Sequence, residues 1–430
     1  MAFTRVQKIG NHPTKHKAAC IGPTAKAISE LISKGLSLPD LPTMYRYTLG
    51  RIIEQLKARD LGGILLFDPI NIRYATGSQN MQVWTSRNLS RAAFVSAAGY
   101  VVLWDFVRCE HLTDHLENID ERRTGAGALY FAYGDTENQQ AESFVSEVID
   151  LMRAHGCEGR IAIDTADVAT ANALQNSQIK VLPGQGIMEH ARLIKGVEEI
   201  KAMRCAVAAC ELAVGEMEEA MRPGLAEVEL WSVLHSGNIA RGGEWIETRL
   251  VASGPRTNPW MQEAGTRQLA KGDLFAFDTD MIGLYGYCCD MSRTWLVGDK
   301  ATAEQKDIYK VAYDHVNQNM DLMKPGVSFR ELSFGGHQLP EEYHAQRYCV
   351  KMHGTGMCDE FPTIYYPEDF IEGAFEYQLE PGMVFSVEVY AGKVGGRDGV
   401  KLENQVLITS EGYENLSIYP YDDSLLAASF

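Results

Sequence analysis

The feature that most restricts how this chain can fold is the presence of acidic residues inside apolar, strand-like segments. Glu388 lies in the run VFSVEVY, and Glu403 lies in VKLENQVLI. A carboxylate is costly to bury alone among apolar side chains, so each of these acids needs a compensating group. A glycine-rich turn between Gly392 and Gly399 separates the two segments, and we expect them to pair as neighbouring strands.

Three aspartates repeat this pattern earlier in the chain. In FDTD, Asp278 and Asp280 are two positions apart, and a strand would place both carboxylates on the same face. Asp290 follows a turn region between Gly283 and Gly286. A hairpin can therefore bring Asp290 opposite the first two aspartates.

A histidine flanked by glycines adds a nitrogen ligand to these acids. His353 opens the segment HGTGMCDEFP (353–362), whose glycines let the backbone bend tightly and bring the imidazole close to another group. Any one of the acids could face solvent, but five acids in three strand-like segments, with one histidine, indicate a shared site. Clustered carboxylates repel one another unless a cation neutralises them. This hard ligand set suits iron, manganese or cobalt, and two ions sharing bridging carboxylates would explain the number of acids.

Composition excludes several classes of function. The net charge of −17 would repel nucleic acids and anionic membranes. The nine cysteines include no C-x-x-C pair, which indicates reduced thiols rather than disulfides or a thiolate zinc site. The N-terminus lacks the apolar segment of a secretory signal, and no uninterrupted apolar stretch of about eighteen residues could span a membrane. We therefore expect a cytoplasmic protein with neither nucleic-acid nor membrane partners.

The order of the predicted elements divides the chain into three parts. Residues 1–43 are rich in Lys, Pro, Ser and Gly and indicate an N-terminal arm. Residues 44–190 alternate helical and strand patterns, which is typical of a small α/β domain. Residues 191–430 begin with a long helical pattern and continue with long hairpins. We expect this last part to be an α+β domain that contains the acids and the histidine.

These motifs, in this order, resemble the creatinase/prolidase/methionine-aminopeptidase superfamily. Three further segments carry the resemblance: NIRYATG (71–77), ARLIKGVEEIKAMR (191–204) and RPG (222–224). It implies an α+β pita-bread catalytic domain with two metal ions, a smaller α/β N-terminal domain, and a homodimer. The implied metal ligands are Asp278, Asp280, Asp290, His353, Glu388 and Glu403. The spacing of the aspartates leaves open whether Asp278 or Asp280 is the conventional ligand.

The chain departs from the peptidases of this superfamily at two positions. Those peptidases carry a histidine three residues before the proline that ends the HG-x-G segment, where this chain has Asp359. They carry another after a small-residue motif similar to VASGPRTNP (251–259), where this chain has Trp260. An ionised aspartate accepts protons, so Asp359 could act as a general base. A metal-bound carboxylate substrate has a more acidic α-carbon, and removing its proton with loss of a β-leaving group is a β-elimination.

The same departures, together with NMQVWTSRN (80–88), resemble the DddP-type dimethylsulfoniopropionate lyases. This resemblance implies a carbon–sulfur lyase that forms dimethyl sulfide and acrylate. Iron is the expected metal, with manganese, cobalt, nickel and zinc as alternatives. A sulfonium is a soft cation that aromatic faces attract by roughly 0.5–2 kcal/mol per contact. The candidate substrate-binding residues are therefore Trp84, Tyr348 and Trp260.

Each of these residues also has a purely structural interpretation. Trp260 could fill a gap, Tyr348 could be a core tyrosine, and Asp359 could cap a turn. Trp84 lies in a polar loop, where an exposed tryptophan indicates a ligand or partner, within its own subunit or across a dimer interface. We interpret Glu360 as structural.

Two other functions fit the same fold. A peptidase acting on X-Pro peptides would require Asp359 or a water to replace the missing histidines. A non-catalytic binding module would not need the complete set of metal-binding side chains, so the retained set argues against it.

Overall fold

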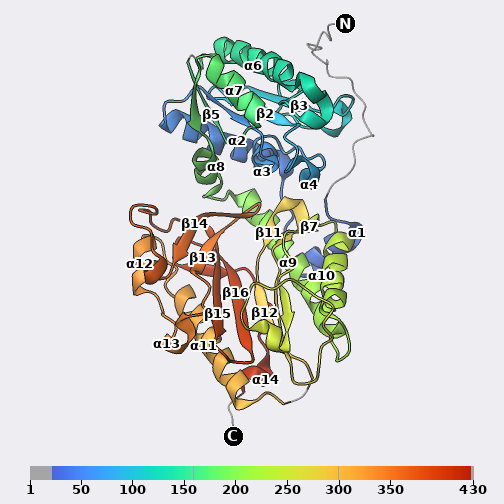
Figure 1. The fold of residues 1–430 in the computed structure, drawn as a ribbon, viewed down its shortest axis with the longest axis vertical. Helices are drawn as coiled ribbons and strands as arrows, with labels where there is room; N and C mark the ends of the chain where they lie inside the picture. Colours follow the sequence, from blue (N-terminus) through green and yellow to red (C-terminus); the bar gives the residue numbers. More distant parts are fainter. Residues whose placement is uncertain (1–21, 158, 299, 428–430) are drawn as a thin grey trace. The chain divides into compact units, whose positions relative to one another are not determined.

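The computed structural model describes residues 22–427 apart from positions 158 and 299, and these residues form two compact units (Figure 1). The first unit contains residues 40–192, and the second contains residues 22–39 together with the described residues from 193 onward. Among the described residues, no helix has both the length and the apolar character needed to cross a membrane.

The expected N-terminal arm differs from the structure in its described part, while its first residues, 1–21, lie outside the described residues. The helix α1 (Ala25–Ser33) begins after Thr24, whose side chain caps it. Leu31 packs in a cluster with residues of α9 (Val197–Ala220) in the second unit. The apolar residues of AKAISELIS recur at helical spacing, which explains why this segment forms an amphipathic helix.

The first unit is built on a six-stranded mixed sheet in the order β4-β3-β2-β1-β5-β6. Its strands are β1 (Gly63–Leu66), β2 (Ala92–Ser96), β3 (Val101–Asp105), β4 (Glu121–Thr124), β5 (Arg160–Ile163) and β6 (Lys180–Pro183). β2 pairs antiparallel with both β1 and β3, whereas the β1–β5, β5–β6 and β3–β4 pairs are parallel. β2 and β3 form a hairpin whose turn includes Gly99 in the left-handed conformation.

Helices complete this α/β unit. They are α2 (Leu41–Ala58), α3 (Pro69–Thr76), α4 (Gln82–Thr85), α5 (Tyr130–Tyr133), α6 (Glu137–Ala154), α7 (Val168–Asn176) and α8 (Gln185–Arg192). Phe144 of α6 packs in one core cluster with Phe94 and Trp104 of the sheet. α2 packs against α3 and α8.

The NIRYATG segment is α3 and the turn that ends it. Asp68 caps the helix by accepting hydrogen bonds from two backbone N–H groups. Asn71 donates to the buried carboxylate of Asp164, and the Tyr74 hydroxyl donates to the carbonyl of Ala191 in α8 at 2.9 Å. Gly77 stops the helix in the left-handed conformation. The motif therefore ties α3 to β5 and α8 and has a structural role.

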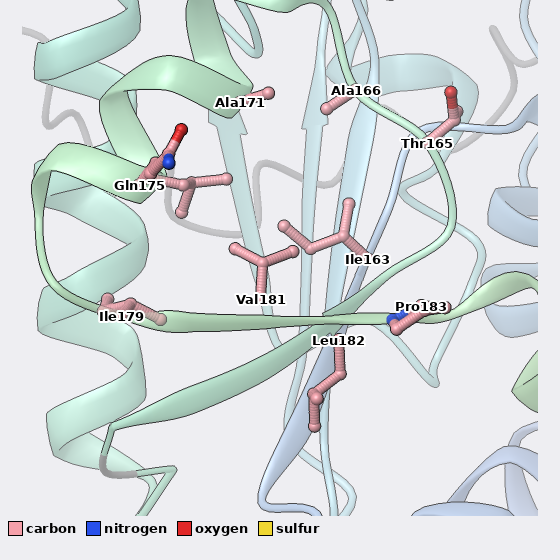
Figure 2. Close-up of a pocket in the computed structure, with 10 residues that line it drawn as sticks. Ile163, Thr165, Ala166, Ala171, Gln175, Ile179, Val181, Leu182 and Pro183 are labelled. Atoms are coloured by element: carbon pink, nitrogen blue, oxygen red, sulfur yellow. The ribbon is translucent and has the colours of Figure 1, made fainter.

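A cavity of about 540 Å³ opens beside the edge strand β6 (Figure 2). Ile163, Leu174, Ile179 and Val181 are among its aliphatic lining residues. None of the lining residues has an ionisable side chain, so this cavity lacks the groups that proton transfer or metal binding needs.

The second unit combines helices with three antiparallel sheets, in the orders β14-β13-β15-β16-β17, β12-β9-β8 and β11-β10-β7. The strands are β7 (Trp245–Ile246), β8 (Val251–Ser253), β9 (Leu274–Asp278), β10 (Met281–Ile282), β11 (Cys288–Cys289), β12 (Ser292–Leu296), β13 (Val350–Thr355), β14 (Asp359–Tyr365), β15 (Val384–Gly392), β16 (Gly399–Ile408) and β17 (Tyr413–Asn415). The remaining helices are α10 (Glu227–Arg241), α11 (Ala303–Met320), α12 (Phe329–Gly335), α13 (Glu341–His344) and α14 (Asp423–Leu426). α11 packs against β15 and β16, and α9 packs against α10.

Candidate metal centre

Two long paired strands present the two glutamates. β15 and β16 pair antiparallel over their whole length, and Glu388 lies directly opposite Glu403. Val387, Val389 and Leu402 belong to the core cluster that includes residues of α11. Successive side chains of a strand point to opposite faces, so both glutamates face away from α11. The strand pairing predicted from the glycine-rich turn is confirmed.

The three aspartates lie close together, but Asp278 and Asp280 are not on one strand as predicted. β9 ends at Asp278, and Asp280 follows with a φ of +34° before the chain enters β10 in another sheet. The prediction that Asp278 and Asp280 share one strand is therefore wrong. Asp290 returns between β11 and β12 through the predicted hairpin, and carboxylate oxygens of all three aspartates lie within 4.8 Å of one another.

His353 lies on β13, between β14 and β15. Its Nε2 is 3.2 Å from Oδ2 of Asp290 and 3.7 Å from Oε1 of both Glu388 and Glu403. His353, Asp290 and Glu403 form one group of potential ligands, and the three aspartates form a second. Asp290 belongs to both groups, which is the position of a bridging carboxylate.

The unpaired oxygens of this cluster fit a metal centre. Oδ1 of Asp290 and Oε1 of Glu388 and of Glu403 are buried, with no hydrogen-bond partner among the described residues. Buried carboxylate oxygens normally have donors or cations beside them. The side chains that could hold metal ions are Asp278, Asp280, Asp290, His353, Glu388 and Glu403.

The crowding of acids perturbs their ionisation. Burial raises the pKa of Glu403 to about 8, and burial with the charge of Glu403 raises the pKa of Asp290. Burial opposes ionisation of Asp278 too, but Lys401 beside it lowers the pKa of this carboxyl. Burial works against the charge of His353, yet neighbouring carboxylates raise its pKa to about 9. These shifts describe a centre in which carboxylates outnumber the positively charged groups.

Lys401 is a functional candidate that sequence reasoning missed. Its ammonium lies against three of the acids, Asp278, Glu388 and Glu403. The available signal was its position two residues before Glu403 on the same strand, which places both side chains on one face.

Asp359 begins β14 and has an exposed side chain that reaches the edge of the acidic cluster. Burial raises the pKa of Asp280, and the charges of Asp278 and Asp359 add to this shift, so Asp359 belongs to the same electrostatic cluster. Loss of hydration raises the pKa of Asp359, His353 opposes this shift, and Asp278 adds to it. The next residue, Glu360, points the other way and forms a buried ion pair with Lys195 at 2.5 Å.

Two of the three candidate aromatic residues share one cluster. Trp260 is 7% exposed, and Tyr348 packs against the cluster that contains it. Trp260 stacks on Tyr390, a residue that sequence reasoning missed, with ring centroids 6.1 Å apart. Tyr390 lies two residues after Glu388 on β15, on the same face. Burial and the charge of Glu388 raise the pKa of Tyr348.

The third aromatic residue lies in the other unit. Trp84 belongs to α4, and its ring centroid lies 5.8 Å from that of Phe106 and 6.2 Å from that of Phe131. The structure does not bring Trp84 together with the acids within one unit. Trp295 of β12 lies in the core beside Phe277.

Comparisons with solved structures show the fold, and two family models show the class of protein. An Xaa-Pro dipeptidase from Bacillus anthracis has a TM-score of 0.70 at 22% identity and covers 88% of this chain and 99% of its own. A prolidase from Pyrococcus horikoshii has a TM-score of 0.68 at 19% identity and covers 87% and 99%. Residues 201–410 match the metallopeptidase family M24, and residues 49–194 match the creatinase/prolidase N-terminal domain. The predicted pita-bread fold with a smaller α/β domain is confirmed.

Two relatives identify the family of this chain within the creatinase/prolidase superfamily. The dimethylsulfoniopropionate lyase DddP of Roseovarius nubinhibens is 46% identical over 97% of this chain and 95% of its own length. The protein of the same name from Roseobacter denitrificans is 44% identical over 94% and 92%. The chain belongs to the DddP lyase family, within the creatinase/prolidase superfamily.

Proposed function

We propose that this protein cleaves dimethylsulfoniopropionate to dimethyl sulfide and acrylate by β-elimination, with Asp359 as the general base. The observation that carries this proposal is the electrostatic interaction of Asp359 with Asp280, at the edge of a cluster of potential metal ligands, in a member of the DddP family. A base must lie within hydrogen-bond reach of the substrate that the centre holds. The exposed position of Asp359 beside the acidic cluster supports this role.

The six ligand side chains would hold two metal ions, with iron as the proposed metal. When bound, the ions would neutralise the acids and draw electron density from the substrate carboxylate, which acidifies the α-carbon. The fit rests on the unpaired oxygens of Asp290, Glu388 and Glu403. Manganese, cobalt, nickel and zinc are the alternatives that metal analysis would distinguish.

The chain's own residues carry the proton. Asp359 accepts a proton from the α-carbon, the electron pair forms the Cα–Cβ double bond, and the Cβ–S bond breaks. The sulfur keeps the bonding electrons and leaves as neutral dimethyl sulfide, so the products are dimethyl sulfide, acrylate and the proton on Asp359. Because Asp359 is exposed, it can return this proton to water before the next turnover.

Aromatic side chains would receive the sulfonium end. Trp260 and Tyr348 lie in one cluster, with Tyr390 stacked behind Trp260. An aromatic face attracts a cation by roughly 0.5–2 kcal/mol. Nε1 of Trp260 is buried without a hydrogen-bond partner among the described residues, so its indole also offers a polar donor.

We also propose that the protein is a homodimer in which Trp84 lies at or near the subunit interface. Around Trp84 the first unit exposes Phe131 at 83%, Val107 at 70% and Val83 at 56%. An apolar surface of this kind indicates a partner. Sedimentation of wild type and of Trp84→Ala tests this, and a monomeric wild type would refute it.

The eight free cysteines of the described chain support the cytoplasm as the location.

The first experiment measures dimethyl sulfide in the headspace above iron-loaded protein given dimethylsulfoniopropionate, with metal-free protein as control. Replacing Asp359 by Ala should reduce elimination by about 100-fold or more and leave the metal content unchanged. Asp314→Ala, which removes an aspartate paired with Lys310 on the surface of α11, is the matched control. Loss of metal from Asp359→Ala would refute the role of base. Silence of fully loaded wild type, with hydrolysis of X-Pro dipeptides, would favour a peptidase instead.

A further inference from the structure

The acidic cluster contains a cation of its own. Lys401 is 1% exposed on β16, and its Nζ lies 3.0 Å from Oδ2 of Asp278, 2.9 Å from Oε2 of Glu388 and 2.7 Å from Oε2 of Glu403. The same Nζ donates to Oγ of Ser292 at 2.9 Å. An ammonium has three protons to donate, and all of them can be used here.

Lys401 and the proposed metal ions use different oxygens of the same glutamates. Oε2 of Glu388 and Oε2 of Glu403 face Lys401, whereas the Oε1 atoms of both residues face His353 and have no hydrogen-bond partner among the described residues. The lysine therefore fixes how each glutamate is turned and leaves one oxygen of each free for a metal ion. Asp290, the potential bridge between the two ligand groups, makes no ion pair with Lys401 among those described.

Lys401 also changes the net charge that an incoming metal ion meets. Its proposed ligands include five carboxylates, Asp278, Asp280, Asp290, Glu388 and Glu403, and when all five are ionised Lys401 reduces their charge from −5 to −4. Two divalent ions match a charge of −4. Like charges repel across a few ångströms in a buried site, so the lysine also opposes the entry of metal while it holds the acids together.

We propose that Lys401 is a built-in counter-ion that keeps the ligand set assembled when metal is absent, at the expense of metal affinity. Lys401 is a positioning residue, because it acts on the substrate only through the ligands that it orients. The inference rests on the metal centre proposed above. Metal binding and folding are linked, so each affects the other by the same free energy. If the variant without the lysine binds metal more tightly than the wild type, metal must also stabilise its fold by a correspondingly larger amount.

The test compares Lys401→Met with Lys351→Met, each metal-free and loaded with Mn²⁺. Lys351 is a second buried lysine, on β13, whose Nζ donates to the carbonyl of Leu332 and makes no ion pair with the acids among those described. Lys401→Met should melt below wild type when metal-free, gain more than wild type from Mn²⁺, and bind Mn²⁺ about tenfold more tightly or better. Lys351→Met should lower both forms equally and leave the Mn²⁺ affinity unchanged.

Other outcomes overturn the inference or separate it from the proposed function. If Lys401→Met lowers both forms equally, or binds Mn²⁺ no more tightly than wild type, Lys401 is only a structural residue. If Lys401→Met does not fold without metal, Lys401→Arg, which keeps the charge, must fold and retain wild-type Mn²⁺ affinity. If wild type binds neither Mn²⁺ nor Fe²⁺, the proposed centre fails. Lys401 then keeps its role as counter-ion only if its loss destabilises the protein more than the loss of Lys351.

Discussion

Metal-free protein should lose stability as the pH rises from 6.5 to 9, because two buried groups of the centre hold protons that the unfolded chain releases. Despite burial, the carboxylates of Asp359, Glu388 and Glu403 raise the pKa of His353 from 6.5 to about 9. Burial raises the pKa of Glu403 from 4.5 to about 8. A group with a higher pKa in the folded state stabilises fully below its unfolded pKa, and this stabilisation is lost as the pH rises through the folded pKa.

The size of the effect follows from His353. Its pKa rises by the difference between about 9 and 6.5, which is about 2.5 units. At about 1.36 kcal/mol per unit, the free energy of unfolding should fall by about 3 kcal/mol over this interval. Glu403 loses its proton in the same range and adds a loss of the same sign.

Urea unfolding of chelator-treated protein at pH 6.5 and pH 9, followed by circular dichroism, measures this loss. His353→Gln carries no proton that titrates in this range, so its stability should depend less on pH by about 3 kcal/mol. Metal-loaded wild type should also lose most of the dependence, because its ligands have already released their protons. Equal stability of metal-free wild type at both pH values, or an undiminished dependence in His353→Gln, would contradict the reasoning.

Three further predictions concern single residues. His353→Ala removes a proposed ligand, so metal content and elimination should fall together; full metal occupancy in this variant would exclude His353 as a ligand. Lys195→Met leaves Glu360 buried without its cation and should cost about 3–5 kcal/mol in urea unfolding. As the control, Lys201→Met breaks a more exposed ion pair and should cost less than about 1 kcal/mol. Equal costs for the two variants would show that burial of the ion pair does not set the loss of stability. Trp260→Ala should raise KM about tenfold with a smaller change in kcat, while Trp260→Phe keeps most of the affinity; an unchanged KM would make Trp260 a packing residue.

The parts of the fold that sequence predicted are those where one local pattern dominates. The long strands carrying Glu388 and Glu403 could be paired from their apolar runs and the glycine-rich turn between them. The hairpin that returns Asp290 could be predicted in the same way. In both cases the chain neighbours along the sequence are also neighbours in the sheet.

The parts that sequence missed depend on contacts between distant segments. Asp280 leaves the strand that ends at Asp278, and its left-handed backbone lets the chain move from one sheet to another; no periodicity in FDTD encodes this change. Lys401 looks like a solvent-facing residue of a strand until Asp278 and Glu388, which come from two other strands, are placed beside it. Tyr390 becomes a candidate site residue only because its ring stacks on Trp260, which is distant in the sequence.

Under the proposed function, the two positions at which the chain differs from the peptidases would set the charge that the site can stabilise. Peptide hydrolysis passes through a tetrahedral intermediate whose oxyanion needs hydrogen-bond donors. Asp359 lies beside Asp280 and the other acids, so when ionised it would repel an oxyanion rather than stabilise it. A cationic substrate would reverse this sign, because the same carboxylate would attract a sulfonium and could take the proton proposed for elimination. Cation–π attraction to the aromatic cluster of Trp260, Tyr348 and Tyr390 would add to this preference. We infer that the loss of the two histidines favours elimination from a cation over attack on a peptide.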